Sequence, residues 1–191
     1  MIRDFLVRTL RRRALVRGFV CQGLIAPDVK LTGLIDVREL GAEVRIGHGC
    51  IIEGRIVCET KDSRIAIGNN VYFGGSIIDC AASITLGSDI LVSYGGVITD
   101  SDNHSPRLSI RRRDVADWRN GKHDWHLHEQ KPVVIQDGAW IGAHVIILKG
   151  VEVGEGAIIG AGSVVRRSIP AWTVAVGNPA EVIREIAPND R

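Results

Sequence analysis

The sequence predicts an all-β fold, a parallel β-helix built from six-residue repeats. Between residues 135 and 165 an aliphatic residue opens every block of six: Ile135, Ile141, Ile147, Val153, Ile159 and Val165. Glycine takes the second or fourth position of most blocks. Neither an α-helix nor a hairpin sheet keeps a period of six, whereas a parallel β-helix does. Three blocks then form one 18-residue coil, and successive coils stack about 4.8 Å apart, with Ile135 directly beneath Val153.

Composition and charge are those of one soluble domain. The chain has 191 residues, of which 45% are hydrophobic and 24% charged, and a net charge of +2. This charge gives no reason to expect a nucleic-acid partner. The absence of an 18-residue apolar run and of a signal-peptide core predicts a cytoplasmic protein. The four cysteines lack metal or disulfide spacing and are expected to be reduced thiols: Cys21, Cys50, Cys58 and Cys80.

Residues 1–20 are expected to form a separate basic amphipathic helix. Apolar residues recur there at helical spacing, and six arginines face a single acidic residue, Asp4. Two interpretations stay open. The helix caps the open end of the β-helix or packs on a partner subunit, or it rests on an anionic membrane as a peripheral contact at the inner face.

The β-helix is expected over residues 21–178, interrupted by an excursion loop at 105–131. That loop contains no sixes and is rich in arginine, histidine and tryptophan, which indicates a functional loop or lid. Asp79 stands where an aliphatic residue is expected, and a carboxylate in the core would be costly. We therefore expect a local slip that turns Asp79 outward.

Residues 179–191 are expected to form a C-terminal helix and tail. Pro179 suits the first turn of a helix, and Val182, Ile183 and Ile186 would give that helix an apolar face. The helix would close the end of the coils.

Four motifs together resemble the hexapeptide-repeat O-acetyltransferases, which include galactoside, maltose and bacterial surface-polysaccharide acetyltransferases. They are an aspartate-rich turn at 100–104 that ends in histidine, WIG at 140–142, AGSVV at 161–165 and GNPAEVIR at 177–184. The resemblance implies left-handed coils and a homotrimer with active sites between neighbouring subunits. It also implies acetyl transfer from acetyl-CoA to a hydroxyl group, without a metal.

The resemblance also assigns roles to individual residues. His104 matches the catalytic general base, a role that suits histidine because its ordinary pKa is about 6.5. Asp102 is a candidate for orienting His104, and a backbone carbonyl is the alternative. The positions that match the acetyl-CoA site are Trp140, Ala143, Ala161, Gly162, Arg166, Arg167 and Arg184.

The acceptor side departs from the galactoside and maltose enzymes. The stretch 72–82 does not match their acceptor contacts, and the arginine helix replaces their N-terminal acceptor segment. Trp118 and Trp125 in the long loop would suit a larger glycan, which a lipid anchor could carry, because aromatic faces pack on sugar rings. Asp79 is a further candidate for contacting the acceptor.

Other functions stay open at this point. An N-acyltransferase acting on an amino sugar nucleotide would share the donor site and the base. A γ-class carbonic anhydrase shares the β-helix and binds zinc through three histidines, but those ligands lie within the coils, whereas His123, His126 and His128 lie in the excursion loop. A non-enzymatic assembly scaffold is the remaining alternative.

Overall fold

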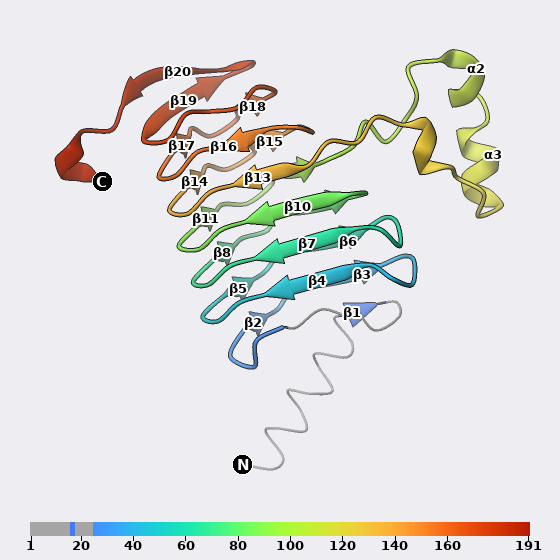
Figure 1. Ribbon diagram of the computed structural model, residues 1–191, viewed down its shortest axis with the longest axis horizontal. Coiled ribbons are helices and arrows are strands. Elements are labelled where there is room, and N and C mark those ends of the chain that lie inside the picture. The colour runs from blue at the N-terminus through green and yellow to red at the C-terminus, as the bar shows by residue number, and fades with distance from the viewer. Residues whose placement is uncertain (1–15, 18–24) are drawn as a thin grey trace, which may run out of the picture.

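A computed structural model describes residues 16–17 and 25–191, which form a parallel β-helix of stacked coils (Figure 1). Its strands make three sheets. One sheet runs in the order β1 (Val16–Arg17), β3 (Leu34–Val37), β6 (Arg55–Cys58), β9 (Ile77–Cys80), β12 (Val97–Thr99), β15 (Ile146–Ile147) and β18 (Val164–Val165). A second runs in the order β16 (Glu152–Val153), β13 (Val133–Ile135), β10 (Ser83–Leu86), β7 (Arg64–Ile67) and β4 (Glu43–Ile46). The third runs in the order β2 (Lys30–Leu31), β5 (Ile51–Ile52), β8 (Tyr72–Phe73), β11 (Leu91–Val92), β14 (Trp140–Ile141), β17 (Ile158–Ile159), β19 (Thr173–Gly177) and β20 (Ala180–Glu185).

The register of the strands confirms the 18-residue coil. Ile135 pairs with Val153 and Ile147 pairs with Val165, in parallel in both cases. Each residue that opens a repeat therefore lies over its counterpart in the next coil. The backbone hydrogen bonds of one coil are satisfied by its neighbours, as buried peptide groups require.

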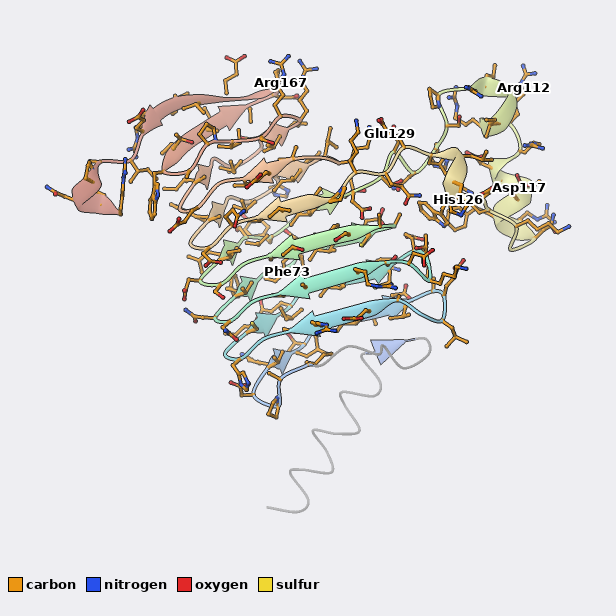
Figure 2. All side chains as sticks on the ribbon, viewed as in Figure 1. Phe73, Arg112, Asp117, His126, Glu129 and Arg167 are labelled. Carbon is orange, nitrogen blue, oxygen red and sulfur yellow. The ribbon has the colours of Figure 1, made fainter. Side chains whose placement is uncertain are left out.

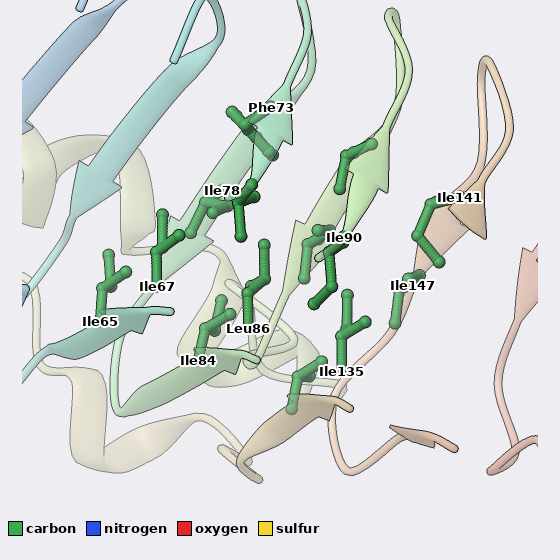
Figure 3. Packing of buried hydrophobic residues seen from close by; sticks show 14 of the residues in the cluster. Ile65, Ile67, Phe73, Ile78, Ile84, Leu86, Ile90, Ile135, Ile141 and Ile147 are labelled. Carbon is green, nitrogen blue, oxygen red and sulfur yellow. The ribbon is translucent and has the colours of Figure 1, made fainter. Parts of the chain in front are cut away.

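The repeat-opening residues point inward and fill the centre of the coils. Figure 3 shows this packing, in which Ile84, Ile135 and the large ring of Phe73 are fully buried. Each such side chain contributes about 1.5–3 kcal/mol on burial. The core therefore follows directly from the six-residue period.

The turn between β9 and β10 is held by a buried carboxylate. Asp100 is 0% exposed, and it accepts hydrogen bonds from the backbone N–H groups of Ala81, Ala82 and Ser83 at 2.6–2.8 Å. A carboxylate with three such donors is well compensated for its burial. Asp100 thereby anchors the chain at the point where it leaves the coil.

Asp79 lies on the outward face of β9, as predicted, because its neighbours Ile78 and Cys80 occupy the inward positions. The strand keeps its alternation, so the carboxylate stays out of the apolar core.

Residues 105–131 leave the coils and project to one side (Figure 1). This excursion carries short helices, α2 (Leu108–Arg111), α3 (Asp114–Arg119) and the 3-10 turn η1 (Trp125–Leu127). Its base is closed where Ser101 bridges Gln130 and where the Lys131 N–H donates to the Asp100 carbonyl at 2.9 Å. The excursion is therefore a folded unit attached to the coil through a short neck.

The predicted C-terminal helix over 179–191 is wrong. Residues 180–185 form β20, which pairs antiparallel with β19. This pairing satisfies backbone groups at the edge of the last coil, and β-branched residues such as Val182 and Ile183 favour a strand. Both remain largely exposed, whereas Ile186 is buried. A single 3-10 turn, η2 (Pro188–Asp190), follows.

The predicted amphipathic helix over residues 1–20 lies outside the described residues, except for its positions 16–17. These two residues form β1, which pairs with β3, and not a helix. Within residues 16–17 and 25–191, no helix has the length and apolarity needed to cross a bilayer.

Candidate functional site

His104 lies just beyond β12, at the neck of the excursion. Its Nδ1 is 2.7 Å from Oδ2 of Asp114, the first residue of α3. The Asp114 side chain is 8% exposed and that of His104 is 54% exposed. Among the described residues, none forms a hydrogen bond with Nε2 of His104. The imidazole is thus held at one nitrogen by a buried carboxylate.

The prediction that Asp102 orients His104 is wrong. The Asp102 carboxylate pairs instead with the Lys149 ammonium at 2.6 Å, and that ammonium also lies 3.2 Å from Glu129. The hydrogen bond with Asp102 raises the pKa of Lys149 above its ordinary value, although burial opposes this. The charged ammonium of Lys149, on a neighbouring coil, is a stronger partner for the Asp102 carboxylate than a neutral imidazole would be.

Three polar side chains, those of Asp79, Asn103 and Glu59, interact where the chain leaves the coils. The Asn103 side-chain amide donates to Oδ2 of Asp79 at 2.9 Å. Burial, followed by the neighbouring Asp79 carboxylate, raises the pKa of Glu59 to about 8, while the Arg38 guanidinium opposes the rise. Within the described part of the chain, Oδ1 of Asp79 and Oδ1 of Asn103 are buried without a hydrogen-bond partner. Asn103, the residue before His104, therefore ties Asp79 to the segment that carries the candidate base.

Four rings of the excursion pack into one aromatic cluster, formed by Trp118, His123, Trp125 and His128. Trp118 stacks on His123 with ring centres 4.2 Å apart, and the Arg38 guanidinium lies 5.9 Å from the centre of the Trp118 ring. Trp118 is 40% exposed, whereas Trp125 is only 8% exposed. The prediction that Trp125 binds the acceptor is therefore wrong, because Trp125 serves as the core of the excursion. Trp118 remains accessible.

The histidines of the excursion are not arranged around a common point. His123 and His128 stack face to face with ring centres 4.8 Å apart, and His126 is exposed. Burial, and then the neighbouring His128, lower the pKa of His123. Across residues 25–191, no group of three or more His, Cys, Asp or Glu side chains is placed to hold a metal ion.

The predicted donor residues lie on two stacked turns that follow β14 and β17. Trp140 is 51% exposed on the outer face of β14. In the first turn the N–H groups of Gly142 and His144 donate to neighbouring coils, whereas among the described residues no acceptor takes the Ala143 N–H. The Gly162 N–H donates to the Ala143 carbonyl at 2.8 Å and so joins the two turns. The stretch 140–143 thus carries an exposed aromatic ring and a backbone N–H that no described residue accepts.

The next turn and the last coil carry the remaining predicted donor residues. Ala161 and Gly162 are exposed, Gly162 has φ +73°, and a Cβ added to Gly162 would meet no atom within 4 Å. Arg166 and Arg167 follow β18 and are exposed. Figure 2 shows the Arg167 side chain at the C-terminal end of the coils, while Arg112 and Asp117 lie on the excursion. Arg184 is exposed on β20.

The sequence reasoning missed Asp114 and Glu59. Asp114 follows three consecutive arginines and carries no repeat or motif that would distinguish it. Its one usable signal is that an acidic residue opens a short helical stretch. Glu59 lies where the six-residue pattern breaks, and no local pattern indicates that its carboxyl is buried.

Comparison with known proteins gives consistent results. Residues 132–167 match the family model for the bacterial transferase hexapeptide (six repeats). The galactoside O-acetyltransferase of Escherichia coli (strain K12) is 35% identical over 131 residues, which cover 68% of this chain and 57% of that protein. The chain spans about half the length of the curated relatives it matches.

Two solved structures share the fold. A polySia-specific acetyltransferase superposes with a TM-score of 0.73 at 28% identity, covering 89% of this chain and 69% of that one. A hexapeptide-repeat acetyltransferase of Vibrio cholerae O1 biovar eltor, complexed with acetyl-CoA, gives a TM-score of 0.59 at 25% identity, covering 96% and 79%.

Proposed function

The chain belongs to the hexapeptide-repeat family of bacterial transferases, and from that premise we propose that it is an acetyl-CoA-dependent O-acetyltransferase acting on a hydroxyl of a sugar or surface glycan. The observation that carries this proposal is His104, whose Nδ1 is 2.7 Å from a buried carboxylate. Such an imidazole has its other nitrogen available to take a proton from an acceptor hydroxyl.

In the proposed reaction, Nε2 of His104 takes the hydroxyl proton as the acceptor oxygen bonds to the thioester carbonyl carbon. The carbonyl oxygen then becomes negatively charged, and the Ala143 N–H is an available donor for it. When the tetrahedral intermediate collapses, the carbon–sulfur bond breaks, the acetyl group stays on the acceptor, and the coenzyme A thiolate receives the proton from His104. The thioester is already activated, so no acetyl-enzyme is required.

The donor site is proposed along the turns after β14 and β17. Trp140, Ala161 and Gly162 would line the pantetheine arm. Arginine pairs phosphate well through its forked donors, and the exposed Arg166, Arg167 and Arg184 would meet the nucleotide end of acetyl-CoA. The Vibrio cholerae relative was solved with acetyl-CoA, which supports acetyl-CoA as the donor.

The acceptor site is proposed between the coils and the excursion, on the side of His104 that faces away from the donor site. The half-buried Asp79 carboxylate would accept a hydrogen bond from a sugar hydroxyl through Oδ2, the oxygen that also accepts from the Asn103 amide. Trp118, which is 40% exposed, would pack on a sugar ring. The chain's similarity to a galactoside O-acetyltransferase supports a sugar acceptor.

The protein is further proposed to act as a cytoplasmic homotrimer, with each site between two subunits. An exposed apolar ladder supports association, because Tyr72, Leu91 and Trp140 pair in register on one face and are 37%, 52% and 51% exposed. Size-exclusion chromatography with light scattering should give three chains per particle. A monomer at micromolar concentration would contradict the shared site.

The function is tested by measuring thiol release from acetyl-CoA with matched acceptors. The panel contains neutral oligosaccharides, sialylated glycans and amino sugar nucleotides. We expect release with a hydroxyl acceptor, and an O-acetyl product that mild alkali removes. An alkali-stable amide formed only with amino sugars would replace the proposal with N-acyl transfer, and no release with any acceptor would refute it.

A further inference from the structure

The excursion folds back so that the carboxylate of Asp114 lies against His104, at the neck of the excursion. Asp114 lies ten residues after His104 in sequence, and its Oδ2 is 2.7 Å from Nδ1. The Asp114 side chain is 8% exposed, although the residues around it in the excursion are mostly exposed. An ionisable group is seldom buried without a partner, and here the partner is the imidazole.

The other nearby carboxylates, those of Asp102 and Asp79, are not paired with His104. Asp102 is the nearest acidic residue in sequence, but its carboxylate is paired with Lys149 at 2.6 Å. Asp79 receives the Asn103 amide at 2.9 Å. Each of these two carboxylates thus has a partner other than His104, whereas Asp114 is paired with His104.

The geometry of the excursion keeps Asp114 in place. The Arg111 guanidinium donates to the carbonyls of Ser105 and Pro106 at 2.8 and 3.2 Å. These bonds tie the end of α2 back to the residues that follow His104. The aromatic cluster then supports α3 through the Trp118–His123 stack. A side chain fixed on two sides can hold a ring nitrogen within the tolerance that proton transfer needs.

We propose that Asp114 is the positioning residue of His104. A carboxylate only accepts hydrogen bonds, so the proton of the neutral imidazole must be on Nδ1, which leaves the lone pair on Nε2. This is the tautomer that can take a proton from an acceptor hydroxyl. Asp114 also stabilises the imidazolium formed after that transfer, and its burial strengthens the attraction. The inference rests on the proposed function for its kinetic consequence, although the tautomer itself does not.

The kinetic test compares Asp114→Asn with Asp117→Asn, a matched change one turn along α3. The asparagine amide can donate to Nδ1 and so favour the wrong tautomer. We expect Asp114→Asn to lower kcat by about 10²- to 10⁴-fold with little change in the KM for acetyl-CoA. Asp114→Glu should restore part of kcat, and Asp117→Asn should match wild type. Equal kcat values in Asp114→Asn and wild type would overturn the assignment.

A double variant separates positioning from a general loss of structure. In the His104→Ala background, Asp114→Asn should cause no further loss of kcat, because its effect passes through the ring. An independent further loss would show that Asp114 acts in another way. Circular dichroism of each variant checks that the β-helix is intact.

The tautomer can be observed without turnover. Nitrogen-15 NMR of the full-length wild-type protein, labelled at histidine and assigned with His104→Ala, should show His104 protonated at Nδ1 when neutral. A neutral His104 protonated at Nε2 would refute the proposal even if Asp114→Asn fails to fold. If no acceptor is acetylated, the proposed function fails while this readout still decides the role of Asp114.

Discussion

Glu59 makes the stability of the fold depend on pH in a calculable way. Burial, followed by the Asp79 carboxylate, raises its pKa from 4.5 to about 8, against the opposing effect of Arg38. Between these two values the folded state holds a proton that the unfolded state releases. The stabilising contribution is therefore complete below pH 4.5 and is lost as the pH rises through about 8.

The magnitude follows from proton linkage. A difference of one bound proton changes the free energy of unfolding by about 1.4 kcal/mol per pH unit. Between pH 5.5 and 7.5, wild type should thus lose roughly 2–3 kcal/mol because of Glu59. Glu59→Gln stays neutral at every pH, so its free energy of unfolding should not contain this slope.

The assay is urea unfolding followed by far-UV circular dichroism at pH 5.5, 6.5 and 7.5. The difference between wild type and Glu59→Gln should change steadily across the series in favour of the variant at high pH. Glu155→Gln, at an exposed position, is the matched control and should show the wild-type slope. Parallel pH dependences in wild type and Glu59→Gln would refute the reasoning.

Three further predictions concern other parts of the molecule. Asp100→Ala leaves three backbone N–H donors without their acceptor, so it should lower the free energy of unfolding by at least about 3 kcal/mol; a urea midpoint near that of wild type would contradict this. Gly156→Ala places a Cβ against the Trp172 ring at φ +62°, so it should lower the free energy of unfolding by about 1 kcal/mol or more. Thermal melting measures this, and an unchanged Tm would contradict it. Trp118→Ala should raise the acceptor KM by about 10-fold, a loss of roughly 1.4 kcal/mol of binding, and leave the KM for acetyl-CoA unchanged. An effect on acetyl-CoA alone would move Trp118 to the donor side.

The coils were predictable because one period sets both the strands and the core. Ile135 had to lie beneath Val153 once three blocks made a coil, and the register shows that it does. Asp79 lies outward for another reason: the period alone would place it inward, and the cost of burying a carboxylate predicted the outward position. Periodic burial is a local property of the sequence, so it can be read without knowing the neighbours.

The C-terminal segment and the excursion were harder, because their structure depends on distant partners. Apolar residues near Pro179 suggested a helix. Residues 180–185 instead form a strand, because they pair with the edge of β19. Trp125 is buried by the other rings of its cluster, a contact that no spacing predicts. Asp114 reaches His104 only because the excursion folds back, so the partner of the base was invisible in the sequence.

The central claim is that His104 takes the proton of an acceptor hydroxyl. The most direct test is the rate of thiol release from saturating acetyl-CoA, with a hydroxyl acceptor, in wild type and in His104→Ala. We expect kcat to fall by about 10²- to 10⁴-fold while acetyl-CoA binding, measured by calorimetry, is retained. Turnover equal to that of wild type in His104→Ala would contradict it.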